Sequence, residues 1–417
     1  MAKETKRNRH GSGTIYRTSD GRYRGQVSLG VDQNGKRIRR SVSGNTRREV
    51  QEAITRLQND ALRGIAIADD RITVKQHFED WLRTKRPPNT RSSTYDKYAA
   101  HVNHDIIPAL GRHRLRELSY RHINAFYEML DERHLSPRTV FDIRSILSMG
   151  LEDAVRKELI TRNPVKVAAK RSKCETEARC LTPDEIRWFL QAAKGERLED
   201  AFILALNTGM RPGEWMGLPW DAIDWHGSKL TIRQAVHEER GKVFLGPLKT
   251  ENGRRTISLP REALDALTRQ RTRQDEEKLA LGDAWNNKNN LVFTDSKGNM
   301  LRRTNIVRRD LKRICRRAGI LRIAERLSIN PEELELVNPG TELTVNQVLN
   351  LPSGGTYKVQ QTDILDNVIL YTFRHTHASL LIYQGVDIKT VSKRLGHKSI
   401  NITLHVFGKI GIINMAM

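Results

Sequence analysis

The sequence predicts a multidomain α+β protein. A small N-terminal three-stranded sheet with one helix comes first, then a helical domain, then a mixed, mainly α domain with a small antiparallel sheet. Three observations predict this arrangement. The 417 residues suffice for two to four domains. Apolar residues follow a strand pattern before residue 44, a helical pattern from 74 to 157, and a mixture of both after 175. The stretches 67–71 and 170–173 are typical of linkers.

The charge balance indicates a polyanionic partner. Lys and Arg number 72 and Asp and Glu number 49, which gives a net charge of +23, while 38% hydrophobic residues are enough for folded domains. We therefore expect a folded protein that binds DNA or RNA. No apolar run approaches the about 18 residues of a membrane helix, and the basic start lacks the apolar stretch of a secretory signal. We expect no membrane partner and a cytoplasmic location.

The first part, residues 1–66, is expected to form a small sheet and one helix. Strands are predicted at Gly13–Tyr16, Tyr23–Leu29 and Arg37–Ser43, with turns between them. Thr46 is a suitable cap for a helix over Arg47–Leu62. A basic sheet of this kind can lie in a DNA groove. The arginines expected on its exposed face are Arg22, Arg24, Arg37, Arg39 and Arg40. The alternative is an ordinary basic surface.

The second part, residues 72–169, is expected to be a domain of four or five helices. The predicted helices are Val74–Lys85, Ser92–Ile107, Tyr120–Arg133 and Pro137–Lys157. Basic residues gather near helix starts and loops, where they can contact phosphates. The candidates for DNA binding here are Lys85, Arg91 and Lys97.

The third part, residues 175–417, combines helices and strands. Thr182 and Pro183 are typical of a helix start, and Ala201–Thr208 is predicted to be a buried helix. Strands are predicted at Lys229–Ala235, Val243–Leu248 and Arg255–Leu259, with helices again from Arg261. The three cysteines lack the CxxC spacing of a structural zinc site.

Four short stretches of the third part carry residues suited to phosphodiester transfer. Such a site without a metal needs a nucleophile, fixed cations on the phosphate oxygens and an acid for the leaving oxygen. Arg211 is expected on a tight turn, with Glu214 close enough to orient it, and Lys249 on a hairpin. Arg374 is expected near the start of a helix, and His397 directly after a helix that ends at a glycine. Arginine suits the cation role because its planar fork binds phosphate oxygens bidentately.

In this order and at these distances, the set resembles the tyrosine recombinase (phage integrase) family. The resemblance covers the whole chain except residues 321–368. It implies an arm-type DNA-binding domain, a SAM-like core-binding domain and a catalytic domain that together form a clamp around duplex DNA. The implied function is site-specific integration, in which attachment-site DNA is cleaved and rejoined through a 3′-phosphotyrosine link. A homotetramer on DNA is implied, with an excisionase or a host DNA-bending protein as further partners.

The resemblance also implies a role for each catalytic candidate. Arg211 and Arg374 would hold the scissile phosphate, Lys249 would protonate the leaving oxygen, and His397 would support the phosphate. No cofactor and no metal is implied, because the charges come from side chains.

Two positions depart from the family pattern. Tyr371 opens the stretch that contains Arg374, and in the family this stretch usually begins with His or Lys. Phe407 stands ten residues after His397, where the family has its nucleophilic tyrosine. A phenyl ring has no oxygen to attack phosphorus, so cleavage is expected to be impaired or abolished. Rescue by His405 or Tyr371, an engineered Tyr-to-Phe change and natural decay remain open. The rival function is a non-catalytic DNA-binding protein that represses attachment sites or recruits an active recombinase.

An acidic stretch interrupts the third part at about 321–368. It holds 3 Lys or Arg against 7 Asp or Glu, whereas the rest of the chain sums to +27. Its text resembles the core of a lysin motif (IAERLSINPEELELVNPG and QVLNLP), followed by the opening of a second copy (TYKVQQTDILDNV). That resemblance implies glycan binding outside the cell. The alternative is an insert that decorates or disrupts the catalytic domain, and whether it folds is open.

Overall fold

The structure is a computed structural model that describes residues 14–31, 37–62, 72–169, 178–340 and 342–407. The chain divides into two compact units, residues 1–175 and 176–417. Both expected linkers, 67–71 and 170–173, lie outside the described residues. Among the described residues, no helix has the length and apolar character needed to cross a membrane. The fold is α+β, as predicted.

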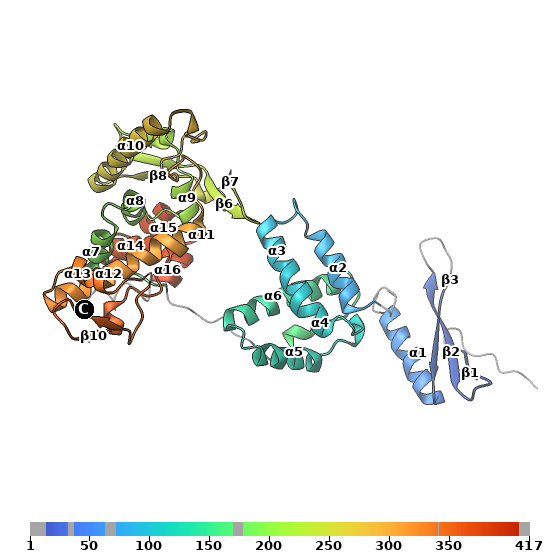
Figure 1. Cartoon of the computed structure of the whole chain (residues 1–417). Helices are drawn as coiled ribbons and strands as arrows, with labels where there is room; N and C mark the ends of the chain where they lie inside the picture. The colour runs from blue at the N-terminus through green and yellow to red at the C-terminus, as the bar shows by residue number, and fades with distance from the viewer. Residues whose placement is uncertain (1–13, 32–36, 63–71, 170–177, 341, 408–417) are drawn as a thin grey trace, which may run out of the picture. The chain divides into compact units, whose positions relative to one another are not determined.

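The first unit begins with a three-stranded antiparallel sheet covered by one helix (Figure 1). The strands are β1 (Thr14–Arg17), β2 (Tyr23–Val31) and β3 (Arg37–Gly44), and the helix is α1 (Arg47–Leu62). Val27, Val50 and Ile54 form the buried centre between sheet and helix. These elements confirm the predicted strands and helix to within two residues at each end.

The strand register does not place the five predicted DNA-binding arginines on one face of the sheet. Gly25 and Val27 of β2 are buried against α1, so Arg24 lies on the opposite, exposed face. Arg39 pairs with Ser28 and therefore shares that outer face, as does Arg37 two residues earlier. Arg40 pairs with Val27, which places it on the helix face. The expectation of one shared face was wrong for Arg40 because neighbouring strand residues point to opposite sides. Arg22 is exposed and precedes β2.

The helical part of the first unit encloses a core of large side chains. Its helices are α2 (Val74–Thr84), α3 (Ser92–His101), α4 (Ile107–Leu110), α5 (Tyr120–Glu132) and α6 (Pro137–Arg156). A π-helical turn, Val102–Ile106, joins α3 to α4, so the predicted helix Ser92–Ile107 is interrupted rather than regular throughout. Phe78, Trp81 and Tyr127 are almost fully buried. Gly150 has no room for a Cβ, which would lie 2.3 Å from the Phe78 ring.

The second unit is mainly helical and is built around one apolar core. The elements that begin before residue 320 are α7 (Pro183–Ala193), α8 (Glu199–Thr208), α9 (Pro212–Met216), β4 (Ile223–Asp224), β5 (Lys229–Ile232), β6 (Ala235–Glu239), β7 (Lys242–Gly246), β8 (Arg255–Ser258), α10 (Arg261–Leu281), α11 (Arg303–Asn305) and α12 (Lys312–Leu327). Those after it are α13 (Pro331–Val337), β9 (Val348–Asn350), β10 (Thr356–Lys358), α14 (Leu370–Tyr383), α15 (Ile388–Leu395) and α16 (Ile400–Phe407). Phe189, Phe202 and Phe373 meet in the core with ring centroids 5.0–5.2 Å apart.

The strands of the second unit pair differently from the prediction. β6 pairs with β7, whereas β8 pairs with β5 in a separate sheet of order β4-β5-β8. The predicted strand Lys229–Ala235 is therefore split between two sheets. Lys249 does not lie on a hairpin; it lies in the segment that connects β7 to β8. The tight turn between β6 and β7 is at Arg240-Gly241, where both residues have positive φ.

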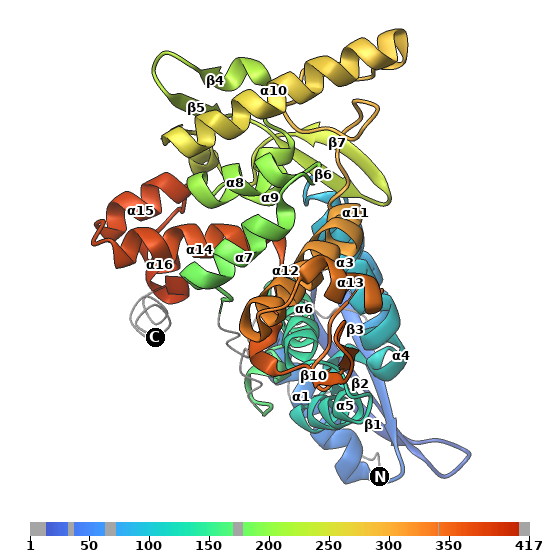
Figure 2. The same ribbon diagram turned by 60° about the vertical axis from the view of Figure 1, so that its left-hand side comes forward.

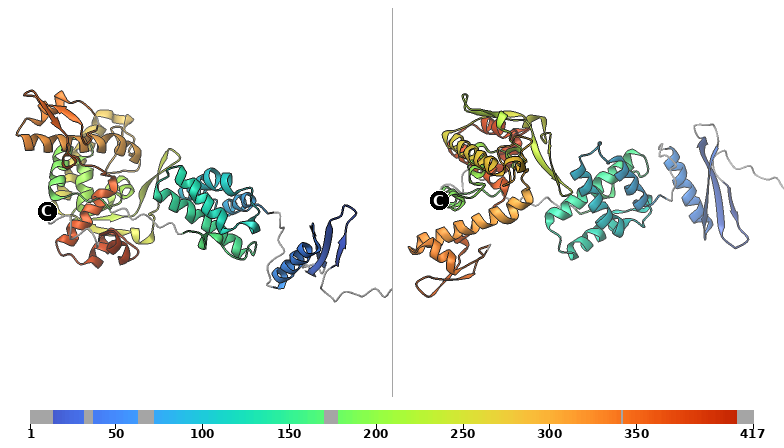
Figure 3. Two further views of the ribbon diagram at one scale, coloured as in Figure 1. Left: turned by 90° about the horizontal axis from the view of Figure 1, so that it is seen from below. Right: turned by 45° about the horizontal axis from the view of Figure 1, so that its top comes forward.

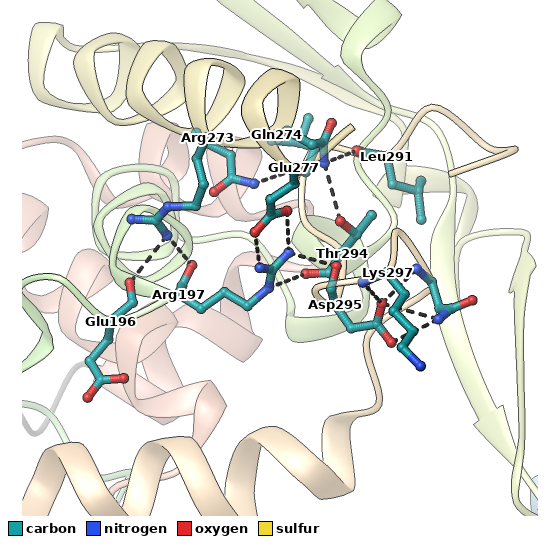
Figure 4. Close-up of polar contacts among 12 residues, drawn as sticks. Glu196, Arg197, Arg273, Gln274, Glu277, Leu291, Thr294, Asp295 and Lys297 are labelled. Atoms are coloured by element: carbon teal, nitrogen blue, oxygen red, sulfur yellow. Dashed lines mark hydrogen bonds and ion pairs between the residues drawn. The ribbon is translucent and has the colours of Figure 1, made fainter. Parts of the chain in front are cut away.

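A network around Arg197 joins α10 to the segment that follows it (Figure 4). Arg197 Nη2 donates to Glu277 Oε2 at 2.8 Å, and Nε donates to the Thr294 carbonyl at 3.0 Å. Arg273 Nη1 donates to the Arg197 carbonyl at 2.7 Å, and Gln274 Nε2 to the Leu291 carbonyl at 3.1 Å. The network satisfies backbone carbonyls that form no regular ladder here, so its role is structural.

The acidic insert is folded and has its own apolar centre. α12 continues unbroken past residue 321, and the insert packs at the end of that helix (Figure 3, orange). The buried side chains include Ile320, Ile323, Leu334, Leu349 and Val359. β9 and β10 form an antiparallel hairpin, so a strand from each lysin-like stretch joins one unit.

Two acidic groups of the insert face arginines of α12. Arg316 Nη1 lies 2.9 Å from Glu335 Oε1, and Arg326 Nη1 lies 2.7 Å from Asp363 Oδ1, whose side chain is fully buried. Pairing of this kind lets an acidic segment pack on a basic helix. The insert is therefore an ordered addition to the second unit.

Candidate functional site

The first arm of the candidate site is positioned by the end of α8. Gly209 caps that helix with a φ of +63°, and a Cβ there would lie 2.6 Å from the His377 ring. Arg211 follows as the N-cap of α9, with Pro212 at the first helical position. The chain thus turns sharply and presents Arg211 directly after a buried helix, as predicted.

Arg211 is held from two sides. Its Nη1 donates to Glu214 Oε1 at 2.7 Å, and its backbone N–H donates to Glu214 Oε2 at 2.9 Å. Its Nη2 donates to the carbonyl of Gly396 at 3.2 Å, across 185 residues of sequence. Glu214 therefore orients Arg211, as its spacing predicted, toward the end of α15.

Arg374 reaches the same place from α14. Its side chain is buried, with Nη1 donating to the Gly209 carbonyl at 2.7 Å and Nη2 to the Leu395 carbonyl at 2.6 Å. Burial, assisted by the nearby charge of Arg211, lowers the pKa of Arg374 to about 9. The insert thus leaves Arg374 in contact with the turn that carries Arg211.

His397 completes the cluster at the end of α15. Gly396 ends that helix with a φ of +67°, and His397 follows it. A 2.8 Å hydrogen bond joins His397 Nδ1 to Thr403 Oγ1 on α16. Burial and the charges of Arg374 and Arg211 lower the pKa of His397 to about 3, so its imidazole is neutral at pH 7. Figure 2 shows α14, α15 and α16 together beside α8 and α9.

Tyr371 lies on α14 one turn before Arg374, on the same side of the helix. Its ring centroid lies 6.3 Å from that of His375, and the guanidinium carbon of Arg303 lies 5.9 Å from the Tyr371 ring centroid. Burial and the charge of Arg374 lower the pKa of His375 to about 4. The structure therefore brings together Arg211, Tyr371, Arg374 and His397, with Arg303 at the edge.

The remaining two predicted catalytic positions are Lys249 and Phe407. Lys249 is exposed in the β7–β8 connection. Phe407 is the last residue of α16, and its side chain, like that of His405, lies outside the described residues.

Sequence reasoning missed Arg255, which ties the Lys249 segment to the cluster. Its Nη2 donates to Glu214 Oε2 at 2.8 Å and its Nε to the Arg394 carbonyl at 2.6 Å. Burial alone would raise the pKa of Glu214, but Arg255 and Arg211 outweigh it, and the pKa is lowered. The available signal was the Arg254-Arg255 pair at the start of a predicted strand, where only Arg255 points inward.

The candidates of the helical part lie in different environments. Lys85 Nζ lies 5.6 Å from the Trp81 ring centroid, and Arg91 is the exposed N-cap of α3. Lys97 Nζ lies 2.6 Å from Asp142 Oδ2, so it would have to leave an ion pair to contact a phosphate. Over the described ranges, no group of three or more His, Cys, Asp or Glu side chains is placed to hold a metal ion.

Comparison with known proteins identifies the family. The sequence pattern of the phage integrase family matches residues 179–334, and that of the phage integrase N-terminal SAM-like domain matches residues 73–130. A tyrosine recombinase XerC-like protein of Caldanaerobacter subterraneus is 27% identical over 403 residues, covering 92% of this chain and 91% of that protein. The chain belongs to the phage integrase family. The first match ends within the insert, before Tyr371, Arg374 and His397.

Other relatives of this integrase-family chain come from mobile elements or resemble it in fold. The ICEBs1 integrase of Bacillus subtilis is 23% identical over 405 residues and 95% of each chain. The Tn1549 transposon integrase, solved with transposon right-end DNA, matches 81% of this chain and 95% of that one at a TM-score of 0.61 and 16% identity. A lambda integrase dimer bound to a core site matches 82% and 97% at a TM-score of 0.52 and 17% identity. These structures share the fold.

Proposed function

We propose that this chain binds duplex DNA at attachment sites as a tyrosine recombinase, and that Phe407 at the nucleophile position impairs cleavage. Arg211, Arg374 and His397 hold the scissile phosphate. The observation that carries the proposal is the convergence of both guanidinium groups on the consecutive carbonyls of Leu395 and Gly396, beside His397. Two guanidinium cations and a neutral imidazole at one point suit a phosphate whose charge grows during transfer.

The step that Phe407 would prevent is DNA cleavage as the family performs it. A tyrosine oxygen attacks phosphorus, the bond to the 5′ oxygen breaks, and a proton passes to that leaving oxygen. Lys249 is our candidate proton donor, because its exposed ammonium lies on a segment that Arg255 ties to the cluster. Phe407 offers no oxygen, so the phosphotyrosine link cannot form there. The DNA-bound states of the Tn1549 and lambda integrases support DNA as the partner.

A suicide-substrate assay tests the proposal. The chain and Phe407→Tyr are incubated with nicked attachment DNA, and covalent protein–DNA adducts are sought on a denaturing gel. We expect adducts from Phe407→Tyr alone, and none when Arg211→Ala is added to it. Adducts from the unchanged chain would mean that another group, such as Tyr371 or His405, is the nucleophile, and the proposed impairment would be wrong.

The second candidate function is non-catalytic, sequence-specific DNA binding. Phe407 favours it, because a chain that cannot cleave can still occupy a site. This function predicts that the unchanged chain and Phe407→Tyr both bind attachment DNA, and that neither forms covalent adducts. Assembly into a homotetramer and recruitment of an excisionase or DNA-bending protein belong to the recombinase proposal and stay predictions.

A further inference from the structure

Arg303 stands at the edge of the candidate site, although no sequence pattern predicted it there. It opens α11, is exposed, and places its guanidinium carbon 5.9 Å from the centroid of the Tyr371 ring. Among the described residues, no carboxylate forms an ion pair with Arg303. Its charge is therefore not neutralised by a carboxylate in this part of the chain.

The backbone around Arg303 is fixed by the β6–β7 hairpin. Arg302 Nη1 donates to the Gly241 carbonyl at 2.8 Å, and Thr304 Oγ1 donates to Glu238 Oε1 at 2.9 Å. The residues on both sides of Arg303 are thus anchored, whereas its own side chain extends to the Tyr371 ring. An anchored backbone and an aromatic platform reduce the freedom that a flexible arginine would lose on binding an anion.

Tyr371 connects Arg303 to the phosphate cluster. It lies three residues before Arg374 on α14, and its ring neighbours that of His375. Tyr371 therefore neighbours both Arg303 and Arg374.

We propose that Arg303 is a further phosphate-binding residue of this site, and that the Tyr371 ring is the positioning residue that holds it there. The proposal rests on the proposed function, since it requires DNA at the cluster. Tyr371 carries no cation, and the Arg303 guanidinium, 5.9 Å from its ring centroid, supplies one beside it. Arginine in this setting can form two parallel hydrogen bonds to a phosphate adjacent to the one held by Arg211 and Arg374.

Salt titration of DNA binding by the full chain tests this inference. The slope of log K against log salt changes by about 0.9 for each phosphate neutralised, so we expect Arg303→Ala to flatten it by about 0.9 on fluorescein-labelled duplex DNA. Tyr371→Phe keeps the ring and should leave the slope unchanged. Tyr371→Leu removes the platform and should flatten the slope as Arg303→Ala does.

The double variant separates positioning from an independent effect. If Tyr371 acts through Arg303, adding Tyr371→Leu to Arg303→Ala causes no further loss. Arg308→Ala is the matched control, because Arg308 is an exposed arginine just after α11; any loss it causes should add fully to that of Tyr371→Leu. All these residues are at least partly exposed, and thermal unfolding checks that each variant folds.

The outcomes separate this inference from the proposed function. An unchanged slope for Arg303→Ala, or full additivity with Tyr371→Leu, would overturn the role of Arg303 while the unchanged chain still binds DNA. Failure of the unchanged chain itself to bind DNA in a salt-dependent way would overturn both.

Discussion

Glu214 balances the positive charge of the candidate site. It is 3% exposed, and its two oxygens accept from Arg211 and Arg255, which otherwise have backbone carbonyls as partners. Arg374 lies close enough for the charge of Arg211 to help lower its pKa. Without the carboxylate, three guanidinium groups would share a largely buried region with only carbonyl dipoles to stabilise them.

Replacing Glu214 by Gln is therefore expected to be strongly destabilising. Removing one partner of a buried ion pair costs about 3–5 kcal/mol, because the remaining charges stay buried. Urea unfolding of the chain and of Glu214→Gln measures the loss. Asp221→Asn is the matched control: it breaks the exposed pair with Arg233 and should cost about 1 kcal/mol or less. Equal losses in the two variants would contradict the bracing role of Glu214.

His377 gives the fold a dependence on pH. It is joined to the Leu206 carbonyl through Nδ1 and accepts from Arg394 Nε at Nε2, and burial and the Arg394 charge lower its pKa to about 3. In the unfolded chain His377 binds a proton near pH 6.5, whereas in the folded chain it stays neutral down to about pH 3. The contribution of His377 to the free energy of unfolding is therefore complete above pH 6.5 and is lost as the pH falls toward 3.

We accordingly expect acid to destabilise the second unit already at pH values well above those at which carboxylates become protonated. The contribution of His377 between pH 7.5 and pH 5 is about 2 kcal/mol, since each pKa unit corresponds to about 1.4 kcal/mol. Unfolding followed at both pH values measures it. His377→Asn keeps a donor for the Leu206 carbonyl and should show a smaller difference between the two pH values. An unchanged difference would assign the effect to other groups, such as His375 and His397.

The turn from α8 to α9 depends on a glycine. Gly209 and Gly195 both have positive φ, but a Cβ at Gly209 would lie 2.8 Å from Leu395 as well as near His377, whereas nothing lies within 4 Å of one at Gly195. The two positions share the conformational penalty and differ only in space.

Gly209→Ala is expected to lose more stability than Gly195→Ala. The left-handed conformation costs about 1–2 kcal/mol at either position, and overpacking at Gly209 adds about 1–3 kcal/mol. Because the turn carries Arg211, DNA binding should weaken in Gly209→Ala alone. Urea midpoints and binding isotherms for both variants test this. Equal effects would show that the contact with α14 and α15 does not constrain the turn.

The elements themselves were largely predictable, whereas their partners were not. Local signals such as the Thr182 capping box and the Gly209 bend carry their own geometry, so the predicted boundaries hold there. The pairing of β8 with β5 depends on residues far apart in sequence, and this is why the hairpin expected around Lys249 was wrong.

The candidate site was predictable in part for the same reason. Arg211, Arg374 and His397 come from ordered local patterns, and the structure brings them together. Arg255 and Arg303 are single arginines among many, and only their tertiary neighbours, Glu214 and Tyr371, distinguish them. No periodicity or spacing in the sequence separates such residues from solvated ones.

The positive charge of the chain is shared unequally between the two units. Residues 1–175 hold 36 Lys or Arg against 21 Asp or Glu, a net +15, whereas residues 176–417 hold 36 against 28, a net +8 that includes the acidic insert. Because long-range attraction to DNA follows net charge, the first unit is expected to supply much of the salt-dependent affinity, although Arg211, Arg374 and His397 lie in the second.

A fragment that holds only the second unit separates these two contributions. Residues 176–417 contain their own apolar core, so we expect this fragment to fold alone, with a cooperative unfolding transition by circular dichroism. It should bind duplex DNA more weakly than the full chain and with a flatter dependence on salt, because each phosphate that is no longer neutralised removes about 0.9 from the slope.

Exposed Arg24, Arg37 and Arg39 of the first unit can then be changed to Ala together in the full chain. If that variant keeps the slope of the unchanged chain while the fragment does not, the remaining phosphate-binding residues belong to the helical part, where Arg91 is exposed and Lys97 is paired with Asp142. Equal slopes for the fragment and the full chain would place all phosphate-binding residues in the second unit and leave the charge of the first without a role in binding.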